Sequence, residues 1–434
     1  MTLVDRLDSA LHTNPWPWAR RALLATVVLT AACHGGSGTS PDPEPPPTYP
    51  APTKKTGMTW YKDVLPIVQD HCQGCHTTGG IAPFPLLTYS DGQRMARQMS
   101  SAVVSRYMPP WMPSDDCQSF ANSRRLTEDQ IDTIYSWADD SAPEGNAADA
   151  PPPAMPPVAL PWVDKTLDGG SSYMPNGAVT DDYHCFVLDP MLGSDQTLIG
   201  YDFVPGVRSQ VHHVLVYAGS LSEAKSKDAA TPEPGYTCYG GPEITDPQLV
   251  AAWVPGSSAT EFPATTGVPI KAGSGLVMQI HYNLANGAPQ ADRSQLKMQF
   301  AKQPVLRPAI ITPLAQTDFS IPPASTGYSA SNILTVPGNI TLWGLAPHMH
   351  TLGRRARVET VAQGSVPSTC LIDIPKWDFH WQQLYFYAGT SGLKVSAGTK
   401  VKLTCTWDNP GSSPIKWGES TSDEMCINYF YVTP

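Results

Sequence analysis

The sequence has no excess of positive charge, and its N-terminal apolar run is short. The formal net charge is -10 over 434 residues, which argues against nucleic acid or an anionic membrane surface as a partner. The apolar run, residues 22–29, is too short for a transmembrane helix. With 45 prolines and 34 glycines, the composition is instead typical of many short strands joined by turns, together with Pro-rich linkers.

The first 32 residues resemble a bacterial lipoprotein signal peptide. Arg20 and Arg21 precede the apolar run, and Thr-Ala-Ala follows it, directly before Cys33. Cys33 would be the lipidated first residue of the mature chain, although Thr30 stands where such signals usually carry leucine. A plain secretory signal cleaved nearby and twin-arginine export are the alternatives. Each predicts export, which permits disulfides, and the lipid would anchor the protein to the bacterial cell envelope.

Two Pro-rich stretches flank a helical segment. Residues 33–57 predict a disordered tether, and residues 146–162 predict a semi-rigid linker. Between them, residues 58–145 are expected to be mostly helical. Thr127 and Gln130 fit a capping box, and apolar residues follow at helical spacing.

The rest of the chain is expected to be antiparallel β structure. Short alternating runs are separated by Gly, Pro, Asn and Ser, which is typical of β-sandwiches. The length of residues 163–434 is more than one sandwich usually needs. We therefore expect a first sandwich over 163–315 and a second over 316–434, divided near 310–325.

A motif in the helical segment predicts covalent haem. Cys72-Gln-Gly-Cys75-His76 has the spacing of a c-type haem attachment site, in which two thiols bond to the haem and His76 is the proximal iron ligand. A methionine would complete the iron, and we favour Met108 because two prolines stiffen its loop. Met112 as the ligand, or Met108 as loop packing, stays open, as do a redox dithiol and half of a zinc site. The segment resembles a small class I cytochrome c, of the version fused to bacterial copper proteins.

A histidine pair and a methionine near the C-terminus suggest copper. His348 and His350 are two residues apart, so that in a strand both would point to one face. Met425 offers a thioether, and imidazole with thioether suits copper, particularly Cu(I). The alternative, if these residues are considered alone, is that the histidines are ordinary strand residues and that the methionine packs in the hydrophobic core.

Three further histidines could form a second copper site. His212 and His213 are adjacent in an apolar run and would face opposite ways in a regular strand. If both bind one metal, the strand must end or bulge there. His281 offers a single third imidazole. The bland alternative is one buried and one exposed histidine.

The order His-His, His, His-X-His, Met over residues 183–434 resembles the type II copper monooxygenases, the family of peptidylglycine α-hydroxylating monooxygenase and dopamine β-monooxygenase. The resemblance implies two jelly-roll-like β-sandwiches facing a cleft and binding two copper ions. It implies an electron-storing copper and a dioxygen-binding copper, and assigns a tyrosine beside the substrate. By this resemblance, the electron-storing copper would be held by His212, His213 and His281, and the dioxygen-binding copper by His348, His350 and Met425. Tyr429 stands where the family has the tyrosine beside the substrate.

The resemblance also concerns cysteines and the substrate. It implies a disulfide Cys405–Cys426 that would pin the methionine ligand, and we expect a second, Cys185–Cys238. Cys117 and Cys370 are left unassigned, although a bridge between them would join the helical segment to the catalytic part. Ala346 stands where the peptide enzyme has an arginine for the substrate carboxylate, so a C-terminal glycine peptide is not expected. His184 and His380 are expected to be structural.

The predicted function is copper-dependent hydroxylation of a C–H bond of an unknown small organic substrate by dioxygen. Electrons would pass from an external donor through the fused haem c to the three-histidine copper. A periplasmic copper-binding or electron-transfer lipoprotein without hydroxylation is the alternative. A haem-dithiol redox protein with a β-sandwich binding module is a third reading, which requires the absence of copper.

Overall fold

The computed structural model describes residues 48–78, 80, 82–153, 159–255, 257–285, 287–418, 420 and 422–434. The predicted signal peptide, the lipidation site Cys33 and most of the tether lie outside these residues. Within the described part of the chain, no helix is both long and apolar enough to cross a bilayer.

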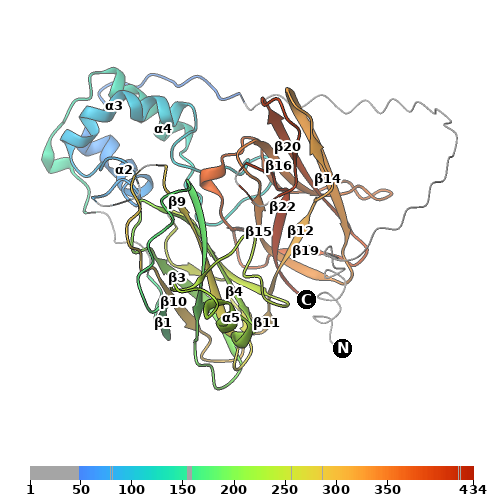
Figure 1. The fold of residues 1–434 in the computed structure, drawn as a ribbon. Helices are drawn as coiled ribbons and strands as arrows, with labels where there is room; N and C mark the ends of the chain where they lie inside the picture. The colour runs from blue at the N-terminus through green and yellow to red at the C-terminus, as the bar shows by residue number, and fades with distance from the viewer. Residues whose placement is uncertain are drawn as a thin grey trace.

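A small helical unit forms one end of the molecule and lies above the first β-sandwich and beside the second (Figure 1). It comprises η1 (Trp60–Val64), α2 (Leu65–His71), α3 (Tyr89–Val104) and α4 (Glu128–Asp139), followed by the short turn η2 (Ala147–Asp149). The helices bury their own apolar core. The predicted capping box at Thr127 and Gln130 is confirmed, because the side chain of each residue accepts from the other's backbone N–H.

The first sandwich packs two antiparallel sheets face to face, apart from a short parallel pair at one edge. One sheet has the order β5-β2-β9-β4-β6 and the other β1-β10-β3-β8-β11, with β7 beside β3. Their bounds are β1 (Lys165–Asp168), β2 (Asp181–Leu188), β3 (Gln196–Val204), β4 (Val211–Gly219), β5 (Tyr236–Thr237), β6 (Gln248–Trp253), β7 (Thr260–Glu261), β8 (Thr266–Ile270), β9 (Gly275–Asn283), β10 (Gln295–Phe300) and β11 (Arg307–Pro308). Helix α5 (Leu221–Asp228) follows β4. The predicted disulfide Cys185–Cys238 is confirmed.

The second sandwich has the same two-layer form. One sheet has the order β12-β22-β15-β18, with β19 beside β15, and the other has β14-β20-β16-β17. Their bounds are β12 (Ile310–Ala315), β14 (Ser325–Thr335), β15 (Ile340–His348), β16 (Gly353–Thr360), β17 (Cys370–Ile374), β18 (Tyr385–Phe386), β19 (Leu393–Val395), β20 (Lys400–Asn409) and β22 (Ile427–Thr433). A two-residue pair, β13 (Ser320–Ile321) with β21 (Ile415–Lys416), and the turn η3 (Phe379–Trp381) complete it.

The division between the sandwiches falls before β12, at the early end of the expected range 310–325. All six residues of β12 pair with β22 of the second sandwich, so the expected division at 315/316 cuts off a strand of that sheet. The short apolar run of β12 fits either sandwich, and only its pairing with β22, 112–122 positions further along the chain, decides between them.

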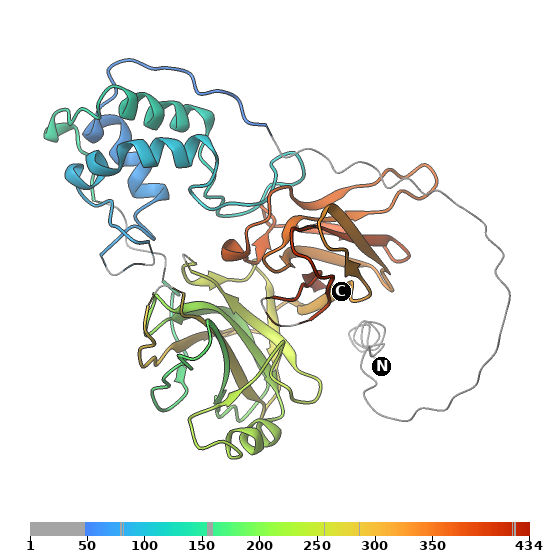
Figure 2. The same ribbon diagram turned by 45° about the horizontal axis from the view of Figure 1, so that its top comes forward.

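A segment of residues 111–124, which we call the arm, leaves the helical unit and packs on the second sandwich; both views show this path (Figure 2). The disulfide Cys117–Cys370 ties it there, which gives the two unassigned cysteines a partner. Backbone bonds from Ala121 to Phe386 and from Ala388 to Ser119 continue the attachment. The predicted helical domain therefore contributes a stretch of chain to the C-terminal sandwich.

Candidate metal sites and the cleft between them

A bulge in β4 brings the first three histidines together. The register of β4 against β9 shifts between Val211 and His213, and the extra residue lets two adjacent side chains point the same way. The Nδ1 atoms of His212, His213 and His281 lie 3.2–3.3 Å from one another. The local irregularity that a shared site requires is therefore present in the strand.

The chemistry of this cluster fits a metal ion. His281 donates Nε2–H to Asp181 at 2.8 Å, which leaves its Nδ1 as a lone-pair donor. Burial lowers the pKa of His212 to about 3 and that of His213 well below its usual value, so the rings are neutral. A point equidistant from three atoms at these separations lies about 1.9 Å from each, close to the length of an imidazole–metal bond of about 2.0 Å. A cation would relieve the repulsion between the converging lone pairs.

The second set of ligands lies where β15 ends. His348 is the last residue of β15 and His350 lies in the turn that follows, so strand alternation does not align them as the sequence argument assumed. His348 donates Nδ1–H to Gln382 at 2.6 Å, and His350 donates Nδ1–H to the Asp423 carbonyl at 3.1 Å. Each ring therefore keeps its Nε2 for a metal. Burial lowers the pKa of His348 to about 3 and also lowers that of His350.

A buried carboxylate connects the second set of ligands. Glu424 is fully buried and accepts from the backbone N–H of His350 at 2.9 Å and of Leu352 at 2.6 Å. It also accepts from the indole of Trp407 at 2.8 Å and from the N–H of Met425 at 3.3 Å. The predicted disulfide Cys405–Cys426 is confirmed and follows the methionine directly. Glu424 thus holds together the turn that carries His350 and the segment that carries Met425.

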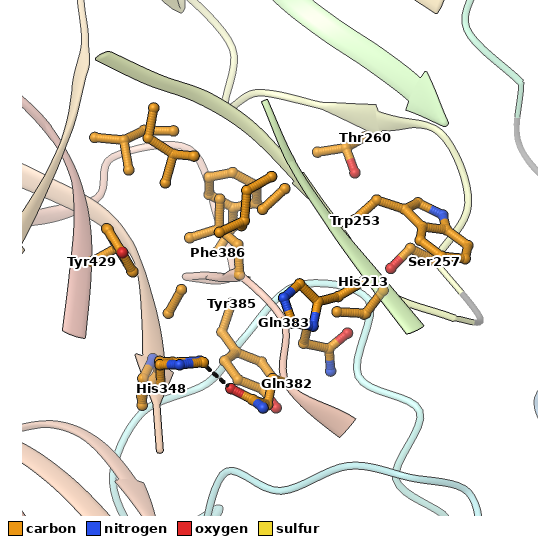
Figure 3. Close-up of a pocket in the computed structure, with 18 of the residues that line it drawn as sticks. His213, Trp253, Ser257, Thr260, His348, Gln382, Gln383, Tyr385, Phe386 and Tyr429 are labelled. Atoms are coloured by element: carbon orange, nitrogen blue, oxygen red, sulfur yellow. Dashed lines mark hydrogen bonds between the residues drawn. The ribbon is translucent and has the colours of Figure 1, made fainter. Parts of the chain in front are cut away.

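One cleft between the sandwiches is lined by His213 of the first set of ligands and by His348, His350 and Met425 of the second. Figure 3 shows His213 and His348 on opposite walls of this cleft, with the hydrogen bond from His348 to Gln382. The cleft encloses about 370 Å³ and is lined by Met425 and Tyr429 among others. Its aromatic lining residues are Trp111, Tyr183, Tyr201, Trp253, Tyr385, Phe386 and Tyr429. A small organic molecule of largely apolar character fits these walls.

Two residues near the ligands were not predicted as part of the site. The ring of Phe379 stacks on His212 with centroids 5.2 Å apart, and lies 6.0 Å from the ring of His350. His380, expected to be structural, lies 5.7 Å from His212 and pairs with Asp378, which raises its pKa. The sequence signal was the aromatic run around these positions, but its placement over the first site depends on the contact between the sandwiches.

The geometry around His76 fits a haem ligand. His76 donates Nδ1–H to the Phe84 carbonyl at 3.0 Å, which leaves Nε2 available for iron. Cys72 and Cys75 are half-buried free thiols. Burial raises the pKa of Cys72 to about 12. It also raises the pKa of Cys75, and Arg124 and Arg208 oppose this because their positive charges lie near that thiol.

The two candidate methionines have different surroundings. Met112 is buried in the core of the second sandwich, where its sulfur accepts the Asp378 backbone N–H at 3.3 Å. Met108 lines a small cavity of the helical unit beside Leu126 and Ile131. The Met112 sulfur thus already accepts a hydrogen bond in the second sandwich, away from the core of the helical unit. Met108 remains in the helical unit.

Comparison with known proteins identifies relatives of the two sandwiches. Residues 173–289 match the family described as copper type II ascorbate-dependent monooxygenase, N-terminal domain, and residues 310–433 match its C-terminal domain. A tyramine beta-hydroxylase of Caenorhabditis briggsae is 24% identical over 301 residues, 64% of this chain and 47% of that protein. MOXD1 homolog 1 of Drosophila melanogaster is 25% identical over 285 residues, 58% of this chain and 40% of that protein. The chain thus spans about half the length of the curated relatives it matches.

Similarity to solved structures is slight. The major capsid protein P2 from bacteriophage PM2 has 10% identity and a TM-score of 0.26, covering 62% of this chain and 97% of that chain. A likeness at this level supports no statement about function.

Proposed function

Since this chain belongs to the copper type II ascorbate-dependent monooxygenase family, we propose that it hydroxylates a C–H bond of a small organic substrate with dioxygen. The observation that carries the proposal is that two separate sets of candidate donors meet at one cleft, which His213 of the first set and His348, His350 and Met425 of the second set line. His212, His213 and His281 would hold one copper. His348, His350 and Met425 would hold the other.

The side chains around the ligands prepare both sites. Copper, when bound, supplies dioxygen activation at the methionine site and one-electron transfer at the three-histidine site. Asp181 and Gln382 fix which ring nitrogen of their histidines carries the proton. The thioether of Met425 favours the reduced metal. Tyr429 and Met425 both line the cleft, and its aromatic walls would shield the substrate from water.

We further propose that Cys72, Cys75, His76 and Met108 would hold a haem c, which would supply electron transfer from an external donor to the three-histidine copper. The charge of Arg208 acts on the Cys75 thiol, and Arg208 is four residues before His212. An arginine that acts on this thiol and lies so close in sequence to His212 supports a short path between the segment of residues 72–76 and the first site. The three disulfides suit an oxidising compartment, and we propose an exported protein anchored through Cys33.

Metal analysis with oxygen uptake tests the proposal. The full chain, matured with haem and loaded with copper, should contain two copper ions and one iron. Oxygen uptake should yield a hydroxylated product, and His350→Ala should abolish it while the three-histidine copper is kept. Copper binding without any product would instead favour a copper-binding or electron-transfer protein. For the relay, a reduced haem that fails to reoxidise when the copper-loaded chain meets oxygen and substrate would exclude it.

A further inference from the structure

The arm forms part of the wall of the cleft. Trp111, Asn122 and Arg124 all line it, although the arm lies outside both segments that match the family. The indole of Trp111 packs edge-on against Tyr385 with centroids 5.3 Å apart. The Cys117–Cys370 disulfide fixes this wall to the second sandwich. A group that the arm presents to the substrate would therefore not come from the two segments that match the family.

Hydrogen-bond donors gather where the arm meets β18. Arg124 donates to Oε1 of Gln383 at 3.0 Å, which fixes the end of the amide that carries the NH₂ group (Nε2). That Nε2 is buried and has no protein acceptor, and the same is true of the hydroxyl of Tyr385. The hydroxyl lies close to Gln383 and to the Met112 backbone but forms no hydrogen bond of good geometry with them. Buried donors without a protein acceptor require one from another source.

The charge at this point favours an anion. Apart from histidines, Arg124 carries the one positive charge and Glu261 the one negative charge among the described residues that line the cleft. Glu261 is solvent-exposed on β7, where water and salt screen it. Arg124 is half-buried, and its charge, with that of Arg125, favours negative charge at Tyr385. A planar anion that accepts several hydrogen bonds matches a guanidinium, an amide N–H and a hydroxyl.

We propose that Arg124, Gln383 and Tyr385 bind a carboxylate of the substrate, so that the substrate class is a carboxylic acid with an apolar or aromatic body. This inference rests on the proposed function. It also predicts the direction of binding, because Gln382, next to Gln383, holds His348. Tyr385 pairs with Leu345 in the strand that ends at His348. The carboxylate is thereby held at the arm, and the body of the substrate extends along the aromatic walls past the methionine site.

Binding measurements separate this inference from catalysis. The copper-loaded full chain is titrated without oxygen, by calorimetry, with phenylpropionate, phenylpropylamine and phenylpropanol, which share one body and differ in the polar group. The carboxylate should bind about ten- to hundredfold more tightly than the alcohol, the range expected for hydrogen bonds to a charged group. Arg124→Gln should remove this preference and leave the affinity for the alcohol unchanged.

Two further variants keep the test decisive. Arg354→Gln removes an equal charge from the surface, where Arg354 pairs with Asp408 outside the cleft, and should leave the preference intact. Tyr385→Phe keeps the ring packing and should weaken only the carboxylate, several-fold. Tighter binding of the amine, no binding of the carboxylate, or an equal loss of acid and alcohol in Arg124→Gln would overturn the inference. The binding measurement needs no turnover. Carboxylate binding without any hydroxylation would therefore support this inference and refute the proposed function. Hydroxylation of an amine or alcohol with no preference for the carboxylate would do the reverse.

Discussion

Glu424→Gln tests whether one buried carboxylate holds the methionine site together. In the structure Glu424 accepts four hydrogen bonds: three at Oε2, from His350, Met425 and Trp407, and one at Oε1, from Leu352. Glutamine has the same shape but only one acceptor oxygen. If that oxygen takes the place of Oε2, the amide NH₂ faces the Leu352 N–H and that donor loses its acceptor.

The expected cost follows from these bonds. A buried donor without an acceptor costs about 1–3 kcal/mol, and each remaining bond weakens by about 1 kcal/mol when its acceptor becomes neutral. Burial raises the pKa of Glu424, which shows that the charge is itself expensive to bury, and removing it offsets part of the loss. We expect a net destabilisation of about 2–4 kcal/mol. The affinity for copper at the methionine site should fall about ten- to hundredfold, as for other groups that orient metal ligands.

Copper titration with equilibrium unfolding measures both effects. The three-histidine site should keep its affinity, so that the second copper alone is lost at limiting metal. Glu359→Gln is the control, because Glu359 lies in the same sandwich and pairs with Arg357 and Lys402 away from the ligands. A Glu424→Gln chain that binds two copper ions as tightly as the parent and unfolds at the same denaturant concentration would refute the reasoning.

Three more predictions follow from the ligands. Asp181→Asn should weaken the three-histidine copper about ten- to hundredfold and leave the other copper bound, as copper titration would show; an equal loss at both sites would contradict it. The pKa of His212 and of His348 is lowered to about 3, so below pH 6.5 the unfolded chain binds protons that the folded chain does not. The metal-free protein should therefore lose about 2 kcal/mol per histidine between pH 7 and pH 5, which urea unfolding at the two pH values would measure; an unchanged midpoint would argue against neutral rings. Met108→Leu should lower the haem reduction potential, while Met112→Leu should not, and the reverse result would exchange their roles.

The arrangement of the arm bears on how the three parts of the chain act together. It crosses from the helices that carry the haem motif to the sandwich that carries the methionine site, and a disulfide fixes it there. Arg124 lines the cleft and also acts on the Cys75 thiol. The proposed haem and the proposed substrate pocket would therefore both lie near Arg124, which suits electron delivery within one chain.

The sequence by itself determined the features that depend on local chemistry. Two of the disulfides, Cys185–Cys238 and Cys405–Cys426, could be predicted from residue type, spacing and resemblance to a family. The candidate ligand types and their order are proposed on the same grounds. The capping box at Thr127 followed from a four-residue pattern. The need for an irregular strand at His212 and His213 followed from strand alternation, since two neighbours cannot otherwise face one ion.

Only the tertiary structure decided the features made by distant segments. Glu424 reaches His350 across 74 residues, and Arg124 reaches Gln383 across 259. The assignment of β12 likewise depended on its partner strand β22. No local pattern encodes such contacts, because a buried glutamate or a half-buried arginine acquires its role from the groups that packing brings to it.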